Sequence, residues 1–358
     1  MKSTRTLSLL AAIVAFLCLA TDGASSVVET FDIASFLDGA YGNLTAPYFG
    51  ARPPRNELKL HRRGWSACSR CGGAERLGAI FPTSTKLSEI AEDEAAELVD
   101  AVRAHGIVVI PGQNLTRAEQ VEFTSRLGEV VVLPSSFEGK DPEPFHPAIQ
   151  RITNFWANGT WKGPDAKLGA YWHQDGQFWV RPGHNVFSVL HAQKTPPTGG
   201  ETGFADLRAA LATLSRPLVE RASRASIECS VRDIADFAGG TEDDLASFPD
   251  ARHPILDVHS MDGGPMLYVG SPHMKVTGLE DESPDAGRGL LELLLAHATG
   301  PSFTYFHAWS AGDVIVWDNT QTLHHAMPYR NDGRAERELY RTQARVMVGE
   351  GSGAGDEL

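Results

Sequence analysis

The chain has 358 residues, of which 42% are hydrophobic and 22% charged, a composition typical of soluble globular proteins. This length is enough for one large catalytic domain or two ordinary ones. The net charge of −13 at pH 7 argues against nucleic acid or an anionic membrane as the main partner, whereas a small anionic substrate needs only a local basic pocket.

Residues 1–20 have the pattern of a secretory signal peptide. Lys2 and Arg5 precede an apolar run over residues 7–20, which is too short to span a bilayer comfortably. Small residues offer cleavage after position 20 or after Ala24, and an uncleaved signal anchor is the alternative interpretation. We therefore expect a protein of the secretory pathway, either in the lumen of the endoplasmic reticulum or secreted, without stable membrane insertion once the signal is cleaved.

Three sequons and the last four residues also concern the secretory pathway. The sequons, which are acceptors for N-glycosylation, begin at Asn43, Asn114 and Asn158. Residues 355–358, Gly-Asp-Glu-Leu, resemble a KDEL-type retrieval signal in which glycine replaces the basic residue, and a random acidic tail is the alternative. The sequence therefore predicts a glycoprotein and leaves its retention in the endoplasmic reticulum open.

Residues 21–84 are rich in Gly, Pro, Arg and Ser and show little hydrophobic periodicity, so we expect a poorly ordered extension there. Cys68 and Cys71 lie within it, at a spacing that suits a local disulfide in an oxidising compartment. Cys229 has no such neighbour in the sequence, and we expect it to be a buried free thiol.

Residues 85–348 show alternating helix and strand patterns at first and mostly strand patterns later. Apolar residues recur at helical spacing over 87–105, Gly106 can end that helix, and Thr116 can cap the next one over 117–127. Further helices are expected over 207–214 and 288–297, and strands over 107–110, 130–133, 151–155, 185–193, 303–307, 313–317 and 337–348. Residues 253–254 and 266–269 are expected to pair around a turn at 262–264. The pattern predicts one α+β domain built on a sheet sandwich, with a flexible tail over 349–358.

A His-x-Asp pair and a later histidine are the candidate metal ligands. Alternate side chains of a strand point to one face, so an extended segment would let His173 and Asp175 chelate one ion. Trp-Asp-Asn at 317–319 ends an apolar strand, and His324 follows it as the third ligand, although His325 would serve in a different loop register. Two histidines and one carboxylate leave coordination positions open, which suits non-haem Fe(II) that activates oxygen.

Two arginines follow the late histidine. Arg337 and Arg341 lie four apart on a predicted strand, so we expect them to face the same way. A guanidinium group forks onto a carboxylate, and this pair therefore predicts binding of a carboxylate-bearing molecule.

Together these segments resemble the TauD/TfdA family of Fe(II)- and 2-oxoglutarate-dependent dioxygenases. The resemblance runs from about residue 85 to 348 and is carried by residues 106–110, 123–128, 172–175, 199–202, 317–319 with 324, and 337–341. It implies a double-stranded β-helix, or jelly-roll, core with flanking helices. It also implies that His173, Asp175 and His324 bind the iron, that Thr202 and Arg337 hold the distal carboxylate of 2-oxoglutarate, and that Arg341 lies near the cosubstrate or substrate.

The reaction implied by the resemblance is oxidative decarboxylation of 2-oxoglutarate to succinate, coupled to hydroxylation of a small organic substrate. Dioxygen is the second cosubstrate, and ascorbate is expected to support the iron. The resemblance does not extend to a particular substrate, because Gln174 stands where the family often has Thr and Thr320 where it often has Arg. Both departures are expected near the pocket.

Two other classes of function share these residues. A zinc-dependent hydrolase could use the same three ligands, but the paired arginines fit a dicarboxylate cosubstrate better. A non-catalytic jelly-roll binding protein is the second alternative, and the presence of all three ligands weighs against it. A homo-oligomer remains open on the sequence alone.

Overall fold

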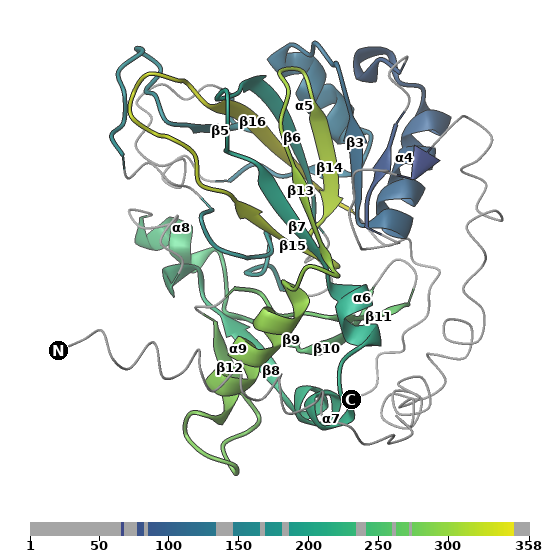
Figure 1. Cartoon of the computed structure of the whole chain (residues 1–358), viewed down its shortest axis with the longest axis vertical. Coiled ribbons are helices and arrows are strands. Elements are labelled where there is room, and N and C mark those ends of the chain that lie inside the picture. The colour runs from purple at the N-terminus through teal and green to yellow at the C-terminus, as the bar shows by residue number, and fades with distance from the viewer. Residues whose placement is uncertain are drawn as a thin grey trace, which may run out of the picture. The chain divides into compact units, whose positions relative to one another are not determined.

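The largest sheet of the computed structural model has eight strands (Figure 1). The structure describes residues 66–67, 77–81, 85–133, 146–164, 169–180, 186–233, 241–259, 263–271 and 274–346. The strand order is β1 (Ser66–Ala67), β2 (Ala79–Ile80), β3 (Ile107–Ile110), β14 (Val314–Asp318), β6 (Val186–Lys194), β16 (Glu338–Arg345) and β4 (Glu129–Val130), with β5 (Gln150–Thr153) also paired to β16. Only the β2–β3 contact among these described strands is parallel.

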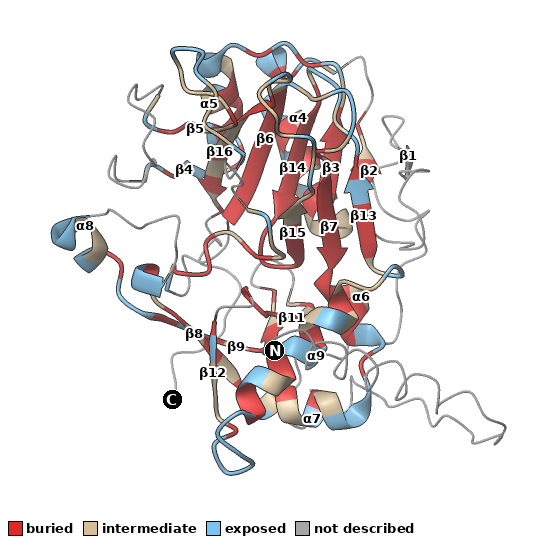
Figure 2. Cartoon of the chain, turned by 60° about the vertical axis from the view of Figure 1, so that its left-hand side comes forward, coloured by how far each residue is buried: buried red, intermediate tan, exposed pale blue. Residues whose placement is uncertain are grey.

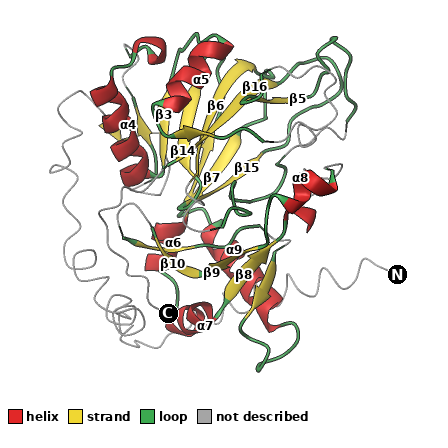
Figure 3. Ribbon diagram, turned by 180° about the vertical axis from the view of Figure 1, so that it is seen from behind, coloured by secondary structure: helices red, strands yellow, loops and turns green. Residues whose placement is uncertain are grey.

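Two helices cover one face of this sheet. They are α4 (Glu92–His105) and α5 (Arg117–Ser125), seen beside β3 and β6 in Figure 3. The predicted helix over 87–105 is interrupted: a 3-10 turn, Leu87–Glu89, precedes α4. Gly106 ends α4 at φ 73°, where a Cβ atom would lie 2.9 Å from the Thr322 methyl group, so glycine is needed there. Thr116 caps α5 as predicted, because its hydroxyl accepts from the Glu119 backbone amide at 3.2 Å.

A smaller sheet packs against the opposite face and completes a two-layer core. It consists of β13 (Thr304–His307), β7 (Thr202–Asp206) and β15 (Thr322–Ala326). Phe204 and Tyr305 of this sheet share one hydrophobic cluster with Ile315 and Trp317 of the large sheet. Figure 2 shows that the central strands β3, β6, β7 and β14 are buried along most of their length. The predicted sheet sandwich, a jelly-roll core with flanking helices, is confirmed.

The segment between β7 and β13 forms helices and two small sheets. Its elements are α6 (Leu207–Ala212), α7 (Arg216–Arg224), β8 (Ser226–Cys229), η5 (Val231–Asp233), α8 (Glu242–Ala246), β9 (Ala251–Pro254), β10 (Leu256–Val258), β11 (Pro265–Leu267), β12 (Lys275–Thr277) and α9 (Ala286–Ala298). The expected pairing of 253–254 with 266–269 is wrong: β9 pairs with β8, and β10 instead forms the hairpin with β11. Cys229 is a buried free cysteine, as predicted.

Several predictions fall on the ends of the chain. The signal peptide, the Asn43 sequon, the Cys68–Cys71 pair and the Gly-Asp-Glu-Leu tail lie outside the described residues. Strand β2 lies before residue 85, where the sequence placed the start of the domain, and its Ala79 is buried in the core. Within the described part of the chain, no helix is long and apolar enough to cross a membrane.

Candidate metal centre

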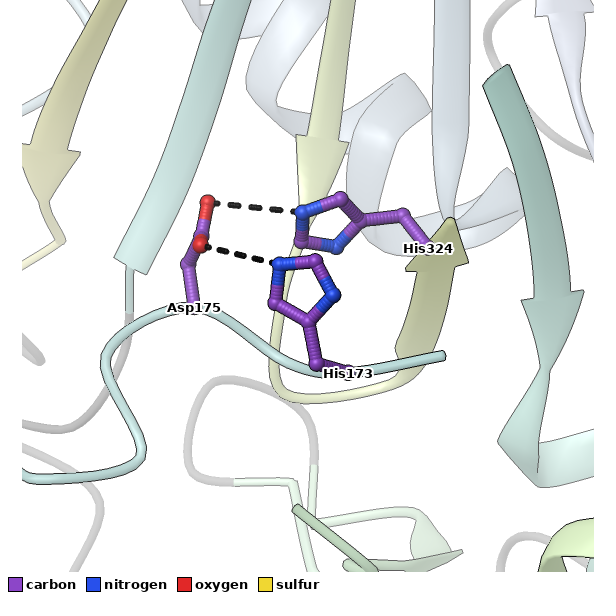
Figure 4. A group of neighbouring side chains, drawn as sticks. All are labelled: His173, Asp175 and His324. Carbon is purple, nitrogen blue, oxygen red and sulfur yellow. Dashed lines mark ion pairs between the residues drawn. The ribbon is translucent and has the colours of Figure 1, made fainter. Parts of the chain in front are cut away.

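His173, Asp175 and His324 converge at one end of the sandwich, with one ligand atom of each within 4.8 Å of the others (Figure 4). The two histidines are brought together by backbone pairing. The His173 amide donates to the His324 carbonyl at 3.0 Å, and the His324 amide donates to the His173 carbonyl at 2.8 Å. As a result, the imidazole centroids lie 4.1 Å apart. Asp175 faces both rings: its Oδ1 lies 3.8 Å from His173 Nε2 and its Oδ2 lies 3.7 Å from His324 Nε2.

The local geometry differs from the extended strand that the sequence suggested. His173 forms an isolated bridge to His324, and the chain turns from Asp175 onward. The turn, rather than a continued strand, brings the carboxylate to the same side as the imidazole.

His325 does not join the three candidate ligands. Neighbouring residues of a strand point to opposite faces, so His324 faces inward and His325 outward. His325 instead packs against the Trp172 ring, with centroids 5.4 Å apart. His324 is therefore the histidine of β15 that completes the group.

The protonation states suit a divalent cation. The Tyr171 carbonyl lies 2.8 Å from His173 Nδ1 and can only accept a hydrogen bond, so Nδ1 donates and Nε2 is the ring nitrogen that faces Asp175. Burial, and next the neighbouring His173, hold the pKa of His324 well below its usual 6.5, so His324 is neutral at pH 7. Metal ligation requires a neutral imidazole, and the lowered pKa of His324 meets that condition.

Asp175 is ionised despite its burial. Burial alone raises the pKa of this carboxyl, but the Arg341 charge, together with the hydrogen bond from the Ser188 hydroxyl, holds the pKa well below its usual range. Arg341 Nη1 donates to both carboxylate oxygens, at 2.9 and 2.8 Å. Two imidazoles and one ionised carboxylate on one side of a site are a donor set that fits Fe(II).

Three polar side chains that the sequence did not single out as ligand supports fix this carboxylate. Ser188 Oγ donates to Asp175 Oδ2 at 3.0 Å, and Gln343 Nε2 donates to the same oxygen at 3.1 Å. Asn319 Nδ2 donates to Ser188 Oγ at 2.9 Å, and Asn319 Oδ1 accepts from the Asp175 amide at 3.1 Å. The one signal for Ser188 in the sequence is its polarity inside the apolar strand β6.

Arg337 is a buried cation that contacts the chain just before strand β7. It is 6% exposed, and its Nε and Nη2 both donate to the Gly200 carbonyl, at 3.3 and 3.2 Å. Burial lowers the pKa of Arg337 to about 10, against the opposing influence of Tyr329 and Glu201, so the group still carries its charge at neutral pH. Among the described residues, no carboxylate lies within ion-pair distance of this guanidinium. Thr202, two residues after Gly200, is 3% exposed.

The two arginines have different partners. A register shift between Glu338 and Leu339 breaks the alternation of β16, and Arg337 lies just before that strand. The expectation that Arg337 and Arg341 share one face rested on a regular strand; in the structure Arg341 contacts Asp175 and Arg337 contacts Gly200.

The two residues that depart from the family pattern make structural contacts. Gln174 is 1% exposed and donates to the carbonyls of Asn319 and Thr320, while its Oε1 accepts from the amides of Val269 and Gly270. The Thr320 hydroxyl donates to Asp318 Oδ1 at 2.6 Å. Their polar groups are thus used in hydrogen bonds within the protein.

Comparison with known proteins gives a consistent result. Residues 70–343 match the family model described as "Taurine catabolism dioxygenase TauD, TfdA family". The chain is 30% identical to an alpha-ketoglutarate-dependent 2,4-dichlorophenoxyacetate dioxygenase of Cupriavidus pinatubonensis over 69% of this chain and 87% of the relative. The fold is similar to a taurine dioxygenase from Burkholderia xenovorans (27% identity, 77% and 88% of the two chains, TM-score 0.61). It is also similar to AAD-2 in complex with Mn(II) and N-oxalylglycine (26% identity, 76% and 96%, TM-score 0.62).

Proposed function

The chain belongs to the TauD, TfdA family of Fe(II)- and 2-oxoglutarate-dependent dioxygenases, and we propose that it binds iron through His173, Asp175 and His324 and hydroxylates a small organic anion. The observation that carries this proposal is the convergence of two imidazoles and one ionised carboxylate in a single group with little solvent exposure. Iron, when bound, supplies open coordination positions and the electrons for activating dioxygen, while 2-oxoglutarate is decarboxylated to succinate.

The residues of the chain orient the ligands and the cosubstrate. The Tyr171 carbonyl fixes the tautomer of His173, and Ser188 and Gln343 hold the carboxylate of Asp175. Arg337 is a buried charge without a carboxylate partner among the described residues, which is costly unless an anion binds there. We assign to Arg337 and Thr202 the distal carboxylate of 2-oxoglutarate, whose fork geometry suits a guanidinium.

The substrate class follows from the relatives and from Arg341. A 2,4-dichlorophenoxyacetate dioxygenase acts on a carboxylic acid, and taurine is a sulfonate. Besides Arg337, Arg341 is a second cation near the candidate ligands: it pairs with Asp175, and its side chain is 15% exposed. We therefore propose a small organic carboxylate or sulfonate as the substrate, with Arg341 as the positive charge nearest to it.

Succinate release tests the proposal. The purified chain is incubated with Fe(II), ascorbate, O2 and 2-oxoglutarate, with 2,4-dichlorophenoxyacetate or taurine as probes and 2-(2,4-dichlorophenoxy)ethanol as the neutral comparator. We expect succinate release that depends on Fe(II), is stimulated by an anionic probe and not by the neutral alcohol, and is abolished in His173→Ala.

His325→Ala is the matched control, because His325 lies next to a candidate ligand but faces away from it. This variant should retain succinate release. Undiminished turnover in His173→Ala, or equal loss in both variants, would contradict the assignment of the ligands. Zn(II)-dependent hydrolysis without succinate would favour the hydrolase alternative.

We also propose that the chain enters the secretory pathway and is glycosylated. Asn114 and Asn158 are exposed. In the Asn114 sequon, however, the Thr116 hydroxyl already accepts a hydrogen bond in the cap of α5. Asn158 and Thr160 are both exposed in a turn, where the Thr160 amide donates to Asn158 Oδ1 at 3.0 Å. Expression of the full chain in a eukaryotic secretory system should give a product whose mass falls on glycosidase treatment, and Asn158→Gln should remove part of that change.

A further inference from the structure

Trp309 donates a hydrogen bond from its indole Nε1 to the hydroxyl oxygen of Thr202, at 3.0 Å. Thr202 begins β7, and Trp309 follows β13, whose His307 is the strand partner of Thr202. The contact therefore joins two neighbouring strands of the smaller sheet. One of its two partners, Thr202, is a residue to which we assign a carboxylate-binding role.

The direction of this hydrogen bond determines whether the Thr202 hydroxyl can still donate its proton in a second hydrogen bond. An indole N–H only donates, so the Thr202 oxygen must accept. The hydroxyl then retains its single proton, and no described residue accepts it. A buried hydroxyl normally uses its proton, so an acceptor is to be expected in the functional state.

A second buried donor, Arg337, contacts the chain just before Thr202. Two residues before Thr202, the Gly200 carbonyl holds the guanidinium of Arg337, which has no carboxylate partner among the described residues. A hydroxyl with a free proton and a guanidinium without an anion are complementary to one carboxylate.

We propose that Trp309 is a positioning residue for the cosubstrate: by filling an acceptor site of Thr202, it directs the Thr202 proton toward the distal carboxylate of 2-oxoglutarate. This inference rests on the proposed function, because it takes 2-oxoglutarate as the molecule that Thr202 and Arg337 bind. Orientation before binding reduces the entropy lost when the carboxylate arrives.

The indole of Trp309 is itself held by a buried chain of side chains. His307 packs edge-on against it, with ring centroids 4.6 Å apart. His307 Nε2 lies 3.1 Å from Asp313 Oδ2, and its Nδ1 lies 3.0 Å from the Tyr305 hydroxyl. Asp313 Oδ2 also accepts from the Ser310 amide at 2.9 Å, which ties the turn after Trp309 to the same carboxylate. These contacts of His307 and Asp313 therefore fix the orientation of the Trp309 indole.

Direct binding of 2-oxoglutarate tests the inference without turnover. Calorimetry on the full chain saturated with Mn(II) would compare the wild type, Trp309→Phe, Thr202→Val and the double variant. We expect Trp309→Phe to weaken 2-oxoglutarate binding about five- to tenfold, the effect of one hydrogen bond. In the Thr202→Val background the same substitution should have no further effect, because the hydroxyl that it orients is already gone. Thr202→Ser keeps a hydroxyl and should restore the sensitivity to Trp309→Phe.

The controls separate this role from packing and from the proposed function. Trp156→Phe is the matched substitution, since that indole packs on Lys162 in another loop, and it should leave 2-oxoglutarate binding unchanged. Mn(II) affinity should be the same in Trp309→Phe and the wild type. Wild-type binding in Trp309→Phe, or additive losses in the double variant, would overturn the role of Trp309. A wild-type chain that binds Mn(II) but not 2-oxoglutarate would instead contradict the proposed function.

Discussion

Arg341 donates from Nη1 to both carboxylate oxygens of Asp175, at 2.9 and 2.8 Å. The pair is largely buried, with side-chain exposures of 15% and 9%. A fixed positive charge therefore stabilises the ionised carboxylate at the position where we propose that iron binds. A metal held by Asp175 would place a second positive charge beside this carboxylate, so guanidinium and metal would each compensate in part for the loss of the other.

Arg341→Gln should destabilise the metal-free protein more than the metal-bound one. Removing the guanidinium leaves the buried Asp175 carboxylate without its main compensating charge, which lowers the free energy of unfolding by about 3 kcal/mol. Saturating Mn(II) supplies a replacement charge, so it should raise the urea midpoint further in the variant than in the wild type. Arg216→Gln is the control, because its ion pair with Glu220 is exposed, and it should cost less than about 0.5 kcal/mol. Equal metal-induced shifts in Arg341→Gln and the wild type would contradict the compensation.

The metal-free protein should lose stability as the pH falls from 7.5 to 5 because of His324. Burial, and next His173, hold the pKa of this imidazole well below 6.5. The unfolded chain takes up a proton below about pH 6.5 that the folded chain does not, so unfolding becomes more favourable as the pH falls. Asp175 has a lowered pKa, and its contribution is present above about pH 4 and is lost only in stronger acid.

Thermal unfolding in the presence of a chelator, at several pH values, checks this assignment. The midpoint of the wild type should fall toward pH 5, and that of His324→Gln should fall less. If both proteins give the same slope, His324 is not the group responsible.

Gln174→Thr should destabilise the fold, although threonine is common in the family at this position. The shorter side chain cannot reach the two carbonyls and two amides that Gln174 joins, and unsatisfied buried polar groups cost about 1–3 kcal/mol each. We expect a loss of roughly 3 kcal/mol in the free energy of unfolding by urea, together with weaker Mn(II) binding. Gln174→Glu keeps an acceptor for the amides of Val269 and Gly270 and loses the donor, so it separates the two halves of the contact. A Gln174→Thr variant as stable as the wild type would show that the contacts are dispensable.

Ser188→Ala should weaken metal binding with little effect on the fold. The Ser188 hydroxyl accepts from Asn319 and Gln343 and donates to Asp175 Oδ2, so its removal takes away one of the hydrogen bonds that orient the carboxylate. Loss of a residue that orients a metal ligand typically costs about tenfold or more in affinity. Calorimetric titration with Mn(II) measures this, with Ser223→Ala on the exposed surface of α7 as the control. Equal Mn(II) affinity in the two variants would remove Ser188 from this role.

Local features of the fold could be predicted from neighbouring residues alone. Thr116 caps its helix as the sequence indicated, because a cap depends on a side chain and an amide two or three positions away, and Asp206 caps α6 by the same local contact. The hairpin near residue 263 could not be placed in the same way. Several short apolar segments compete for that turn, and the pairing of β9 with β8 removes one of them.

The sequence by itself determined the chemistry of the candidate metal centre: the types of the three proposed ligands, their order in the chain and the family to which they point. Only the tertiary structure decided how these groups are held. Backbone pairing of His173 with His324 selected that histidine over His325, and the bulge in β16 gave Arg337 and Arg341 different partners. The physical reason is that hydrogen bonds between distant segments assign each donor and acceptor. The local sequence pattern therefore predicts neither the register of paired strands nor the direction in which a hydroxyl such as that of Thr202 donates its hydrogen bond.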